Sequence, residues 1–228
     1  MSRIALFDCD MTGFPNLALM KLSAWHKAQG NEVLPLNFIM GAEKVYASCV
    51  FPENARQELL PQESKRGGTG FLSQEWLPFA IEHSMPDYHL YQNIDFSMGF
   101  TSRGCLRRCP WCIVPTKEGM IQAWTSIYEF WNRQHSRLWL LDNNLLAAPN
   151  AHETLTALIK EKVKVDFNQA LDIRLVNDET AALLVQCSYD TFLRFSFDRL
   201  PYEPYIHQGL AALQVYNFPM SKIMIFLW

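Results

Sequence analysis

The sequence predicts an α/β protein with two domains. Short apolar runs of strand length alternate with segments of helical periodicity over most of the 228 residues. The first runs form a β-α-β unit, and a longer series of strand–helix pairs starts near residue 96. We therefore expect a Rossmann-like domain over residues 1–85, a linker over 86–95, and a partial, incomplete βα barrel of the TIM type over 96–228.

The β-α-β unit rests on one helix and three strands. Arg3–Asp8 is a short apolar run that ends in an acid, which is typical of a buried parallel strand. The helical pattern of Leu17–Gln29 starts after a capping residue, Asn16, and stops at Gly30. Two further strands are expected over 32–36 and 44–51.

A glycine-rich stretch, Ser64–Gly70, follows this unit. It lacks the Gly-Lys-Ser/Thr ending with which a P-loop binds phosphate, so we expect a flexible connector. The first strand is not followed by G-x-G-x-x-G either, and a dinucleotide site is therefore not expected.

The second half of the chain repeats a strand–helix pattern. Strands are expected over 96–101, 138–141, 163–171, 192–197 and 221–228. Helices are expected over 121–132, 152–162, 178–186 and 205–216. Because the parallel strands of a βα barrel place their carboxyl ends at one edge, we expect the ligand site there.

The loop after the first of these strands carries three cysteines. Cys105, Cys109 and Cys112 have the spacing C-x3-C-x2-C. Three thiolates on one short loop can hold an iron–sulfur cluster and leave one iron without a protein ligand, just as catalytic zinc sites keep an open position. The pattern therefore predicts a metal centre that can bind a further molecule.

Other interpretations of the cysteines have less support. Structural zinc needs four protein ligands, and neither His83 nor His89 has a zinc-like spacing to the loop. Six cysteines are too few for a disulfide scaffold, and we expect Cys9, Cys49 and Cys187 to be ordinary buried thiols. One alternative function stays open, that of a non-catalytic zinc or iron–sulfur protein or a redox sensor.

The run from Gly99 to Cys112 resembles the radical S-adenosylmethionine (SAM) superfamily, and the domain order is similar to that of its cobalamin-binding (B12-type) members. The resemblance implies a 4Fe-4S cluster on the three cysteines, whose open iron binds SAM. It implies reductive cleavage of SAM to a 5′-deoxyadenosyl radical, which abstracts hydrogen from an unknown substrate. Trp111 would pack near the adenine, and a flavodoxin-like or ferredoxin-like protein would donate the electron.

The resemblance also assigns polar residues at the strand ends to SAM. These cofactor-binding candidates are Asp142, Asn143, Asn144, Gln169, Arg174, Ser196 and Asp198. The first three take the position of the family's Gly-Gly-Glu, which binds the SAM amino group. For Arg174 with Asp172, a loop ion pair is an equal alternative. No residue is assigned a catalytic role.

The cobalamin motif of the family is missing from this chain. That motif is D-x-H-x-x-G, with histidine as the cobalt ligand, whereas the loop Asp8–Gly13 contains no histidine. We therefore expect a degenerate cobalamin-binding-like domain that does not bind cobalamin through histidine. Base-off binding without a protein ligand remains open.

Composition limits the partners. A formal net charge of −3 gives no reason to expect nucleic-acid or membrane binding, and no apolar run approaches the roughly 20 residues of a membrane span. Without a signal peptide, a cytoplasmic protein is expected.

Three arginines, Arg103, Arg107 and Arg108, surround the cysteines in the sequence. They could raise a cluster's reduction potential, pair with the SAM carboxylate or attract an acidic electron donor.

The last run, Ile223–Trp228, is apolar and has no turn residue or following helix. It predicts a truncated barrel whose final strand exposes an apolar edge. We expect such a chain to bind a cluster, to cleave little SAM, and to aggregate or dimerise through that strand.

Overall fold

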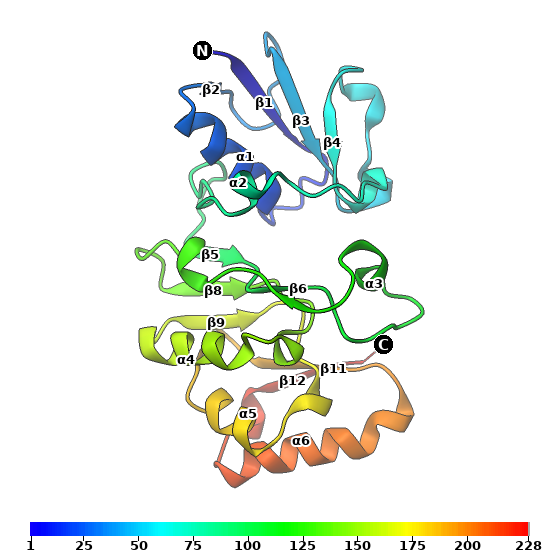
Figure 1. The fold of residues 1–228 in the computed structure, drawn as a ribbon, viewed down its shortest axis with the longest axis vertical. Coiled ribbons are helices and arrows are strands. Elements are labelled where there is room, and N and C mark those ends of the chain that lie inside the picture. Colours follow the sequence, from blue (N-terminus) through cyan, green and yellow to red (C-terminus); the bar gives the residue numbers. More distant parts are fainter. Residues whose placement is uncertain (228) are drawn as a thin grey trace. The chain divides into compact units, whose positions relative to one another are not determined.

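The computed structural model describes residues 1–227 and confirms an α/β fold built on parallel sheets. The chain forms two compact units, with the boundary between Ile94 and Asp95 (Figure 1). This boundary lies at the end of the segment that was expected to be a linker. Each unit has its own sheet and its own hydrophobic core.

The first unit contains a four-stranded parallel sheet with the order β2-β1-β3-β4. Its strands and helices are β1 (Arg3–Asp8), β2 (Glu32–Val33), β3 (Lys44–Ser48), β4 (Lys65–Gly67), α1 (Leu17–Ala28) and α2 (Phe79–Glu82). The predictions for β1 and α1 are confirmed, whereas β2 and β3 are shorter than expected. The Asn16 side chain caps α1 by accepting a hydrogen bond from the Leu19 backbone N–H at 3.3 Å.

The apolar face of α1 is what fixes this helix on the sheet. Leu19 and Leu22 form one core cluster with Ile4 and Leu6 of β1, and all four side chains are buried. Full burial of one such side chain contributes about 1.5–3 kcal/mol relative to its exposed state. The helical stripe in the sequence therefore predicted α1 correctly because the same stripe makes the core.

The glycine-rich stretch belongs to this sheet, so the prediction of a flexible connector is wrong. Lys65–Gly67 forms β4, which pairs in parallel with β3. Gly68 follows with a φ of +96°, and a Cβ at that position would collide with the carbonyl oxygen of Cys49. Glycine is needed there because the two backbone segments pass very close to each other.

The segment expected to be a linker is bound to the first unit. The Asp87 carboxylate accepts a hydrogen bond from Lys27 Nζ of α1 at 2.6 Å. Tyr91 donates its hydroxyl hydrogen to Asp8 Oδ2 at 2.6 Å. The first unit therefore extends to Ile94, beyond the boundary expected from the sequence.

The second unit contains a parallel sheet with the order β10-β9-β8-β5 and a parallel pair of β11 and β12. The strands are β5 (Phe96–Gly99), β8 (Arg137–Leu140), β9 (Lys164–Phe167), β10 (Ser188–Tyr189), β11 (Leu193–Phe197) and β12 (Ile223–Leu227). A parallel bridge between Leu171 and Phe195 connects the chain after β9 to β11. A short antiparallel pair, β6 (Ser102–Arg103) with β7 (Gln122–Ala123), comes between β5 and β8 in sequence.

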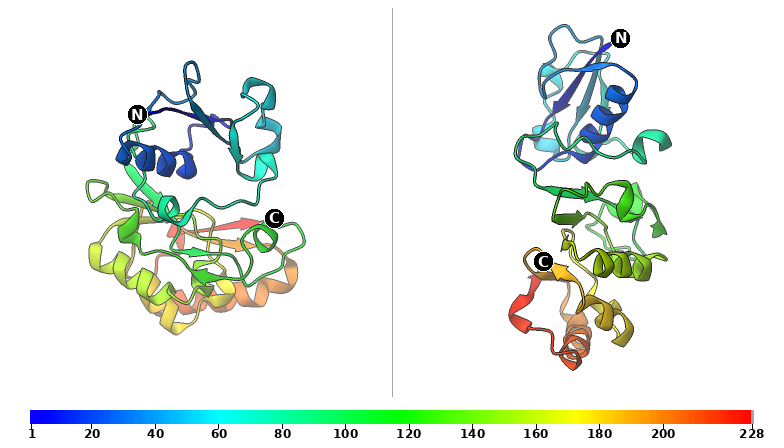
Figure 2. Two further views of the ribbon diagram at one scale, coloured as in Figure 1. Left: turned by 45° about the horizontal axis from the view of Figure 1, so that its top comes forward. Right: turned by 90° about the vertical axis from the view of Figure 1, so that its left-hand side faces the viewer.

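The helices of the second unit are α3 (Val114–Lys117), α4 (Ala151–Glu161), α5 (Asp178–Leu184) and α6 (Glu203–Val215). The helices α4, α5 and α6 lie along one side of the strands, whereas α3 lies apart from them (Figures 1 and 2). The last three agree closely with the predicted helices, and α5 contacts both α4 and α6. Leu155, Leu184 and Leu213 bury their side chains in the core of this unit. Within residues 1–227, no helix is long and apolar enough to cross a bilayer.

The helix expected over 121–132 is wrong. This segment forms β7 and then a single 3-10 turn over Ile127–Glu129. The Trp124 backbone N–H donates to the carbonyl oxygen of Thr101 at 2.9 Å, so the first part of the segment is hydrogen-bonded to the chain after β5 and does not form a helix. The aromatic side chains produced a helical stripe by spacing alone, and tertiary contacts decided the backbone conformation.

Candidate metal centre

The predicted site residues gather at the carboxyl ends of the strands in the second unit. The cysteine loop follows β5, Asp142–Asn144 follows β8, Asp172 and Arg174 follow β9, and Asp198 follows β11. Because β5, β8 and β9 are parallel, their carboxyl ends lie at one edge of the sheet. Segments that are far apart in sequence therefore meet there.

Asp142 anchors the start of the cysteine loop. Its Oδ1 accepts hydrogen bonds from the Thr101 backbone N–H at 3.1 Å and hydroxyl at 2.8 Å, and from the Ser102 backbone N–H at 2.5 Å and hydroxyl at 2.6 Å. Burial raises the pKa of the Asp142 carboxyl, and the hydrogen bonds from Ser102 and Thr101 oppose that shift. The Asp142 carboxylate therefore binds Thr101 and Ser102 at the start of the cysteine loop.

Glu118 closes the base of the same loop. Its carboxylate accepts hydrogen bonds from Arg103 Nη1 at 3.0 Å, from the Gly104 backbone N–H at 3.0 Å and from Asn143 Nδ2 at 2.7 Å. Gly104 has a φ of +82°, and a Cβ there would collide with the carbonyl oxygen of Met120. Sequence reasoning missed Glu118, because nothing in its local pattern distinguishes it from a solvated acid.

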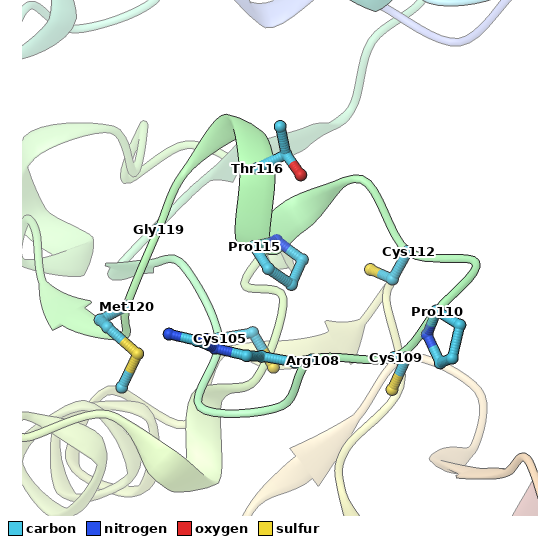
Figure 3. Close-up of a pocket in the computed structure, with 9 residues that line it drawn as sticks. All are labelled: Cys105, Arg108, Cys109, Pro110, Cys112, Pro115, Thr116, Gly119 and Met120. Atoms are coloured by element: carbon cyan, nitrogen blue, oxygen red, sulfur yellow. The ribbon is translucent and has the colours of Figure 1, made fainter.

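The three loop cysteines line a single pocket of about 360 Å³ (Figure 3). All three are free thiols; Cys105 and Cys109 are half-buried and Cys112 is exposed. Burial raises the pKa of Cys109, and the nearby Asp198 carboxylate and the other two thiols add to the effect. Arg108 also lines the pocket, and it is exposed.

The thiols are close together but are not arranged around one point. Among residues 1–227, no three His, Cys, Asp or Glu side chains are placed so that they could hold a metal ion. Figure 3 shows the reason within the loop, where the sulfur atoms of Cys109 and Cys112 point in different directions. Side-chain or loop rearrangement is therefore needed before the three sulfurs can share a metal centre.

The chemistry of the pocket fits an iron–sulfur cluster with an open iron better than a closed zinc site. The residues that line it include three cysteines and no histidine, aspartate or glutamate. Structural zinc requires four protein ligands, whereas Cys thiolates are the usual ligands of iron–sulfur clusters. Among the described residues of the pocket wall, no fourth cysteine and no histidine is available to complete a zinc site.

Asp172 joins the loop to the strand end after β9. It is 6% exposed and accepts hydrogen bonds from Arg174 Nε at 2.6 Å and Arg107 Nε at 2.9 Å. Burial alone would raise the pKa of Asp172, but Arg174 and Arg107 outweigh it and hold that pKa below its usual range. Of the two equal alternatives for Asp172 and Arg174, the loop ion pair is present.

Asn144 lies between Asp172 and the first cysteine. Its Nδ2 is 3.5 Å from Cys105 Sγ and 3.5 Å from Asp172 Oδ2. The Oδ1 atom is buried and has no hydrogen-bond partner among the residues that the structure describes. A buried acceptor without a partner costs about 1–3 kcal/mol, so this oxygen is suited to accept a hydrogen bond from a ligand.

The remaining candidates are less closely connected to the thiols. Trp111 is 54% exposed, and the Arg199 guanidinium lies 5.0 Å from the centre of its indole ring. Ser196 is a half-buried residue of β11, and Gln169 is exposed. Asn144 thus contacts Cys105, and the charge of Asp198 acts on Cys109, whereas no such link is found for Gln169 or Ser196 in the described chain.

Comparison with known proteins gives no family for this chain. No protein-family model matches it, and no curated protein has a significantly similar sequence. The argument for function therefore depends on the chemistry of the site.

Proposed function

We propose that this chain is a radical SAM iron–sulfur protein that resembles the B12-type members of that superfamily. Cys105, Cys109 and Cys112 would hold a 4Fe-4S cluster, which supplies the electron that cleaves SAM to a 5′-deoxyadenosyl radical for hydrogen abstraction from a substrate. The observation that carries the proposal is the pocket whose described wall contains three thiols and no histidine, aspartate or glutamate. Such a set leaves a position for a cofactor.

The strand orders support the finer fold assignment that this function requires. We infer a Rossmann-like first unit from the order β2-β1-β3-β4, with α1 connecting β1 to β2. We infer a partial βα barrel in the second unit because β5, β8 and β9 pair in parallel in chain order, a parallel bridge joins the chain after β9 to β11, and β11 pairs in parallel with β12. The two-residue strand β10 comes between β9 and β11 in sequence and pairs in parallel with β9. Ligand sites of such barrels lie at the carboxyl ends of the strands.

Side chains in the pocket wall and on the segments that meet at the cysteine loop have distinct roles in the proposal. The Oδ1 of Asn144, which has no partner among the described residues, would accept a hydrogen bond from the SAM amino group. Arg108 would pair with the SAM carboxylate, because it lines the pocket. Trp111 would pack near the adenine. Asp142 and Asn143 would hold the loop in place through their contacts with Ser102 and Glu118.

Cobalamin is not part of the proposal. The loop after β1 contains no histidine, and its two acids already have partners. Asp8 accepts the Tyr91 hydroxyl hydrogen, and Asp10 accepts the backbone N–H of Val50 at 2.7 Å and of Phe51 at 3.2 Å. An electron paramagnetic resonance (EPR) spectrum of bound cob(II)alamin with nitrogen hyperfine structure from a protein imidazole would contradict this view.

The environment and the electron donor are proposals as well. All six cysteines are free thiols, which suits a reducing compartment such as the cytoplasm. A flavodoxin-like or ferredoxin-like donor would approach the exposed side of the loop, where Arg108 offers a positive charge to an acidic surface.

A second candidate is a non-catalytic metal protein or redox sensor. It is favoured by the exposed thiol of Cys112 and by the lack of a preformed metal geometry among residues 1–227. Anaerobic purification followed by metal analysis and a SAM cleavage assay separates the two. We expect iron and sulfide after reconstitution, and 5′-deoxyadenosine after reduction in the presence of SAM. One zinc per chain that iron does not replace would support the second candidate.

A further inference from the structure

The N–H donors around Cys105 distinguish it from the other two loop cysteines. Besides Asn144 Nδ2 at 3.5 Å, the backbone N–H of Arg107 donates to Cys105 Sγ at 3.3 Å. Within residues 1–227, no comparable bond to Cys109 or Cys112 sulfur is found. The electrostatic surroundings of the three thiols are therefore unequal.

Asp172 determines which end of the Asn144 amide faces the thiol. The two arginines that bind Asp172 keep it ionised, so it can only accept hydrogen bonds. A carboxylate repels the amide oxygen and attracts the amide nitrogen. The nitrogen of Asn144 must therefore face Asp172, and from that position it also faces Cys105.

This orientation is not explained by stability alone. Asn144 is 3% exposed, and its Oδ1 has no partner in the described part of the chain. An apolar side chain of similar size would avoid the cost of burying that oxygen without a hydrogen bond. The amide is therefore best explained by function: the proposed function assigns its oxygen to SAM, and its nitrogen faces Cys105 Sγ.

We propose that Asn144 is a positioning residue that donates an N–H···S hydrogen bond to the Cys105 thiolate and thereby raises the reduction potential of the metal centre. The reason is electrostatic. Reduction adds negative charge to the cluster and its ligands, and an N–H dipole directed at a ligand sulfur stabilises the reduced state more than the oxidised state. The inference rests on the proposed function, because it needs a cluster on the three cysteines.

The test is a redox titration of the full-length chain, reconstituted anaerobically and measured without SAM. Asn144→Leu removes the donor at similar size, and we expect the iron content to be retained while the potential falls. A tenfold change in the redox equilibrium corresponds to 59 mV for a one-electron couple.

The matched control is Cys187→Ala, which changes a buried core residue of the same unit. Cys187 Sγ donates to the carbonyl oxygen of Leu183 and is not a residue of the pocket wall, so its loss should leave the potential unchanged. A wild-type potential in an iron-loaded Asn144→Leu chain would overturn the inference, and so would an equal fall in the control. If Asn144→Leu does not fold, Asn144→Ala, which removes the N–H donor without adding a charge, decides by the same criterion. A wild-type chain that takes up no iron would contradict the proposed function itself.

Discussion

The three arginines of the cysteine loop show which properties of single residues the sequence could predict. All three were expected near the cluster, but Arg103 is bound to Glu118 at 3.0 Å and Arg107 to Asp172 at 2.9 Å. These two positive charges are balanced by carboxylates of the scaffold. Arg108 is the exposed arginine that lines the pocket. Residue types were predictable, whereas their partners depend on contacts between distant segments.

The three loop cysteines should be essential for iron retention. Replacing Cys105, Cys109 or Cys112 by Ala should abolish cluster binding, because a three-thiolate site has no spare ligand. The matched controls are Cys9→Ala, Cys49→Ala and Cys187→Ala, which remove buried thiols of the cores. Iron and sulfide per folded chain, determined after anaerobic reconstitution, should stay at the wild-type level in these controls. Wild-type iron in a variant of the first set would refute the ligand assignment.

His26 should make the first unit sensitive to acid. Burial lowers the pKa of this imidazole, and the positive charges of Lys44 and Lys65 add to the effect. A lowered pKa means that folding favours the neutral ring, so its contribution is complete above the unfolded pKa of about 6.5 and is lost as the pH falls through the folded pKa. The free energy of unfolding of the chain should therefore decrease below about pH 6.5. His26→Gln should flatten this part of the stability–pH curve, and an unchanged slope would rule out His26 as the cause.

At the scale of elements, the sequence predicted the helices whose apolar side chains pack in a hydrophobic core. It did not predict the segments whose conformation depends on backbone hydrogen bonds to distant parts of the chain. The apolar stripes of α1 and α4 are buried on their sheets, and the sequence predicted both helices. The 121–132 segment has a stripe of the same kind, but its backbone bonds to the loop after β5. The strand β4 contains no apolar residue, so no periodicity could reveal it. The same holds for the candidate site. The spacing of the cysteines is a local pattern and could be recognised in the sequence, whereas the role of Glu118 depends on contacts with distant residues and could not.

A buried ion pair joins α1 to α2, and breaking it should strongly lower the free energy of unfolding of the chain. Lys21 Nζ lies 3.2 Å from Glu82 Oε1 and also donates to the Glu82 carbonyl oxygen; both side chains are 7% exposed. Lys21→Met leaves a buried carboxylate without this partner and should cost about 3–5 kcal/mol of unfolding free energy. Denaturant titration of the full chain measures this.

Two variants complete that experiment. The double variant Lys21→Met with Glu82→Leu should recover most of the loss, since no charge then remains buried at this contact. For the exposed pair Arg133–Glu161, where the arginine side chain is 58% exposed, Arg133→Met should cost at most about 1 kcal/mol. Equal losses for Lys21→Met and Arg133→Met would show that burial is not the cause.

At the scale of the whole molecule, two α/β units divide the chain, and the three-thiol pocket belongs to the second. The sequence predicted both units and the strand end that carries the cysteines. The expected boundary of the first unit came too early in the sequence. Asp87 and Tyr91 bind residues 86–94 to the first unit, but their partners, Lys27 and Asp8, are distant in sequence, so these contacts could not be predicted. No family model matches this chain, so the central claim depends on the three thiols and their surroundings.

The most direct test of that claim is the EPR spectrum of the anaerobically reconstituted, reduced full-length chain, recorded with and without SAM. If an open iron of the cluster binds SAM, the signal of the reduced cluster should shift and change shape when SAM is added. The matched control is Cys187→Ala, which changes a buried core thiol and should respond as the wild type does. A fully loaded, reduced cluster whose spectrum is identical with and without SAM would contradict the account.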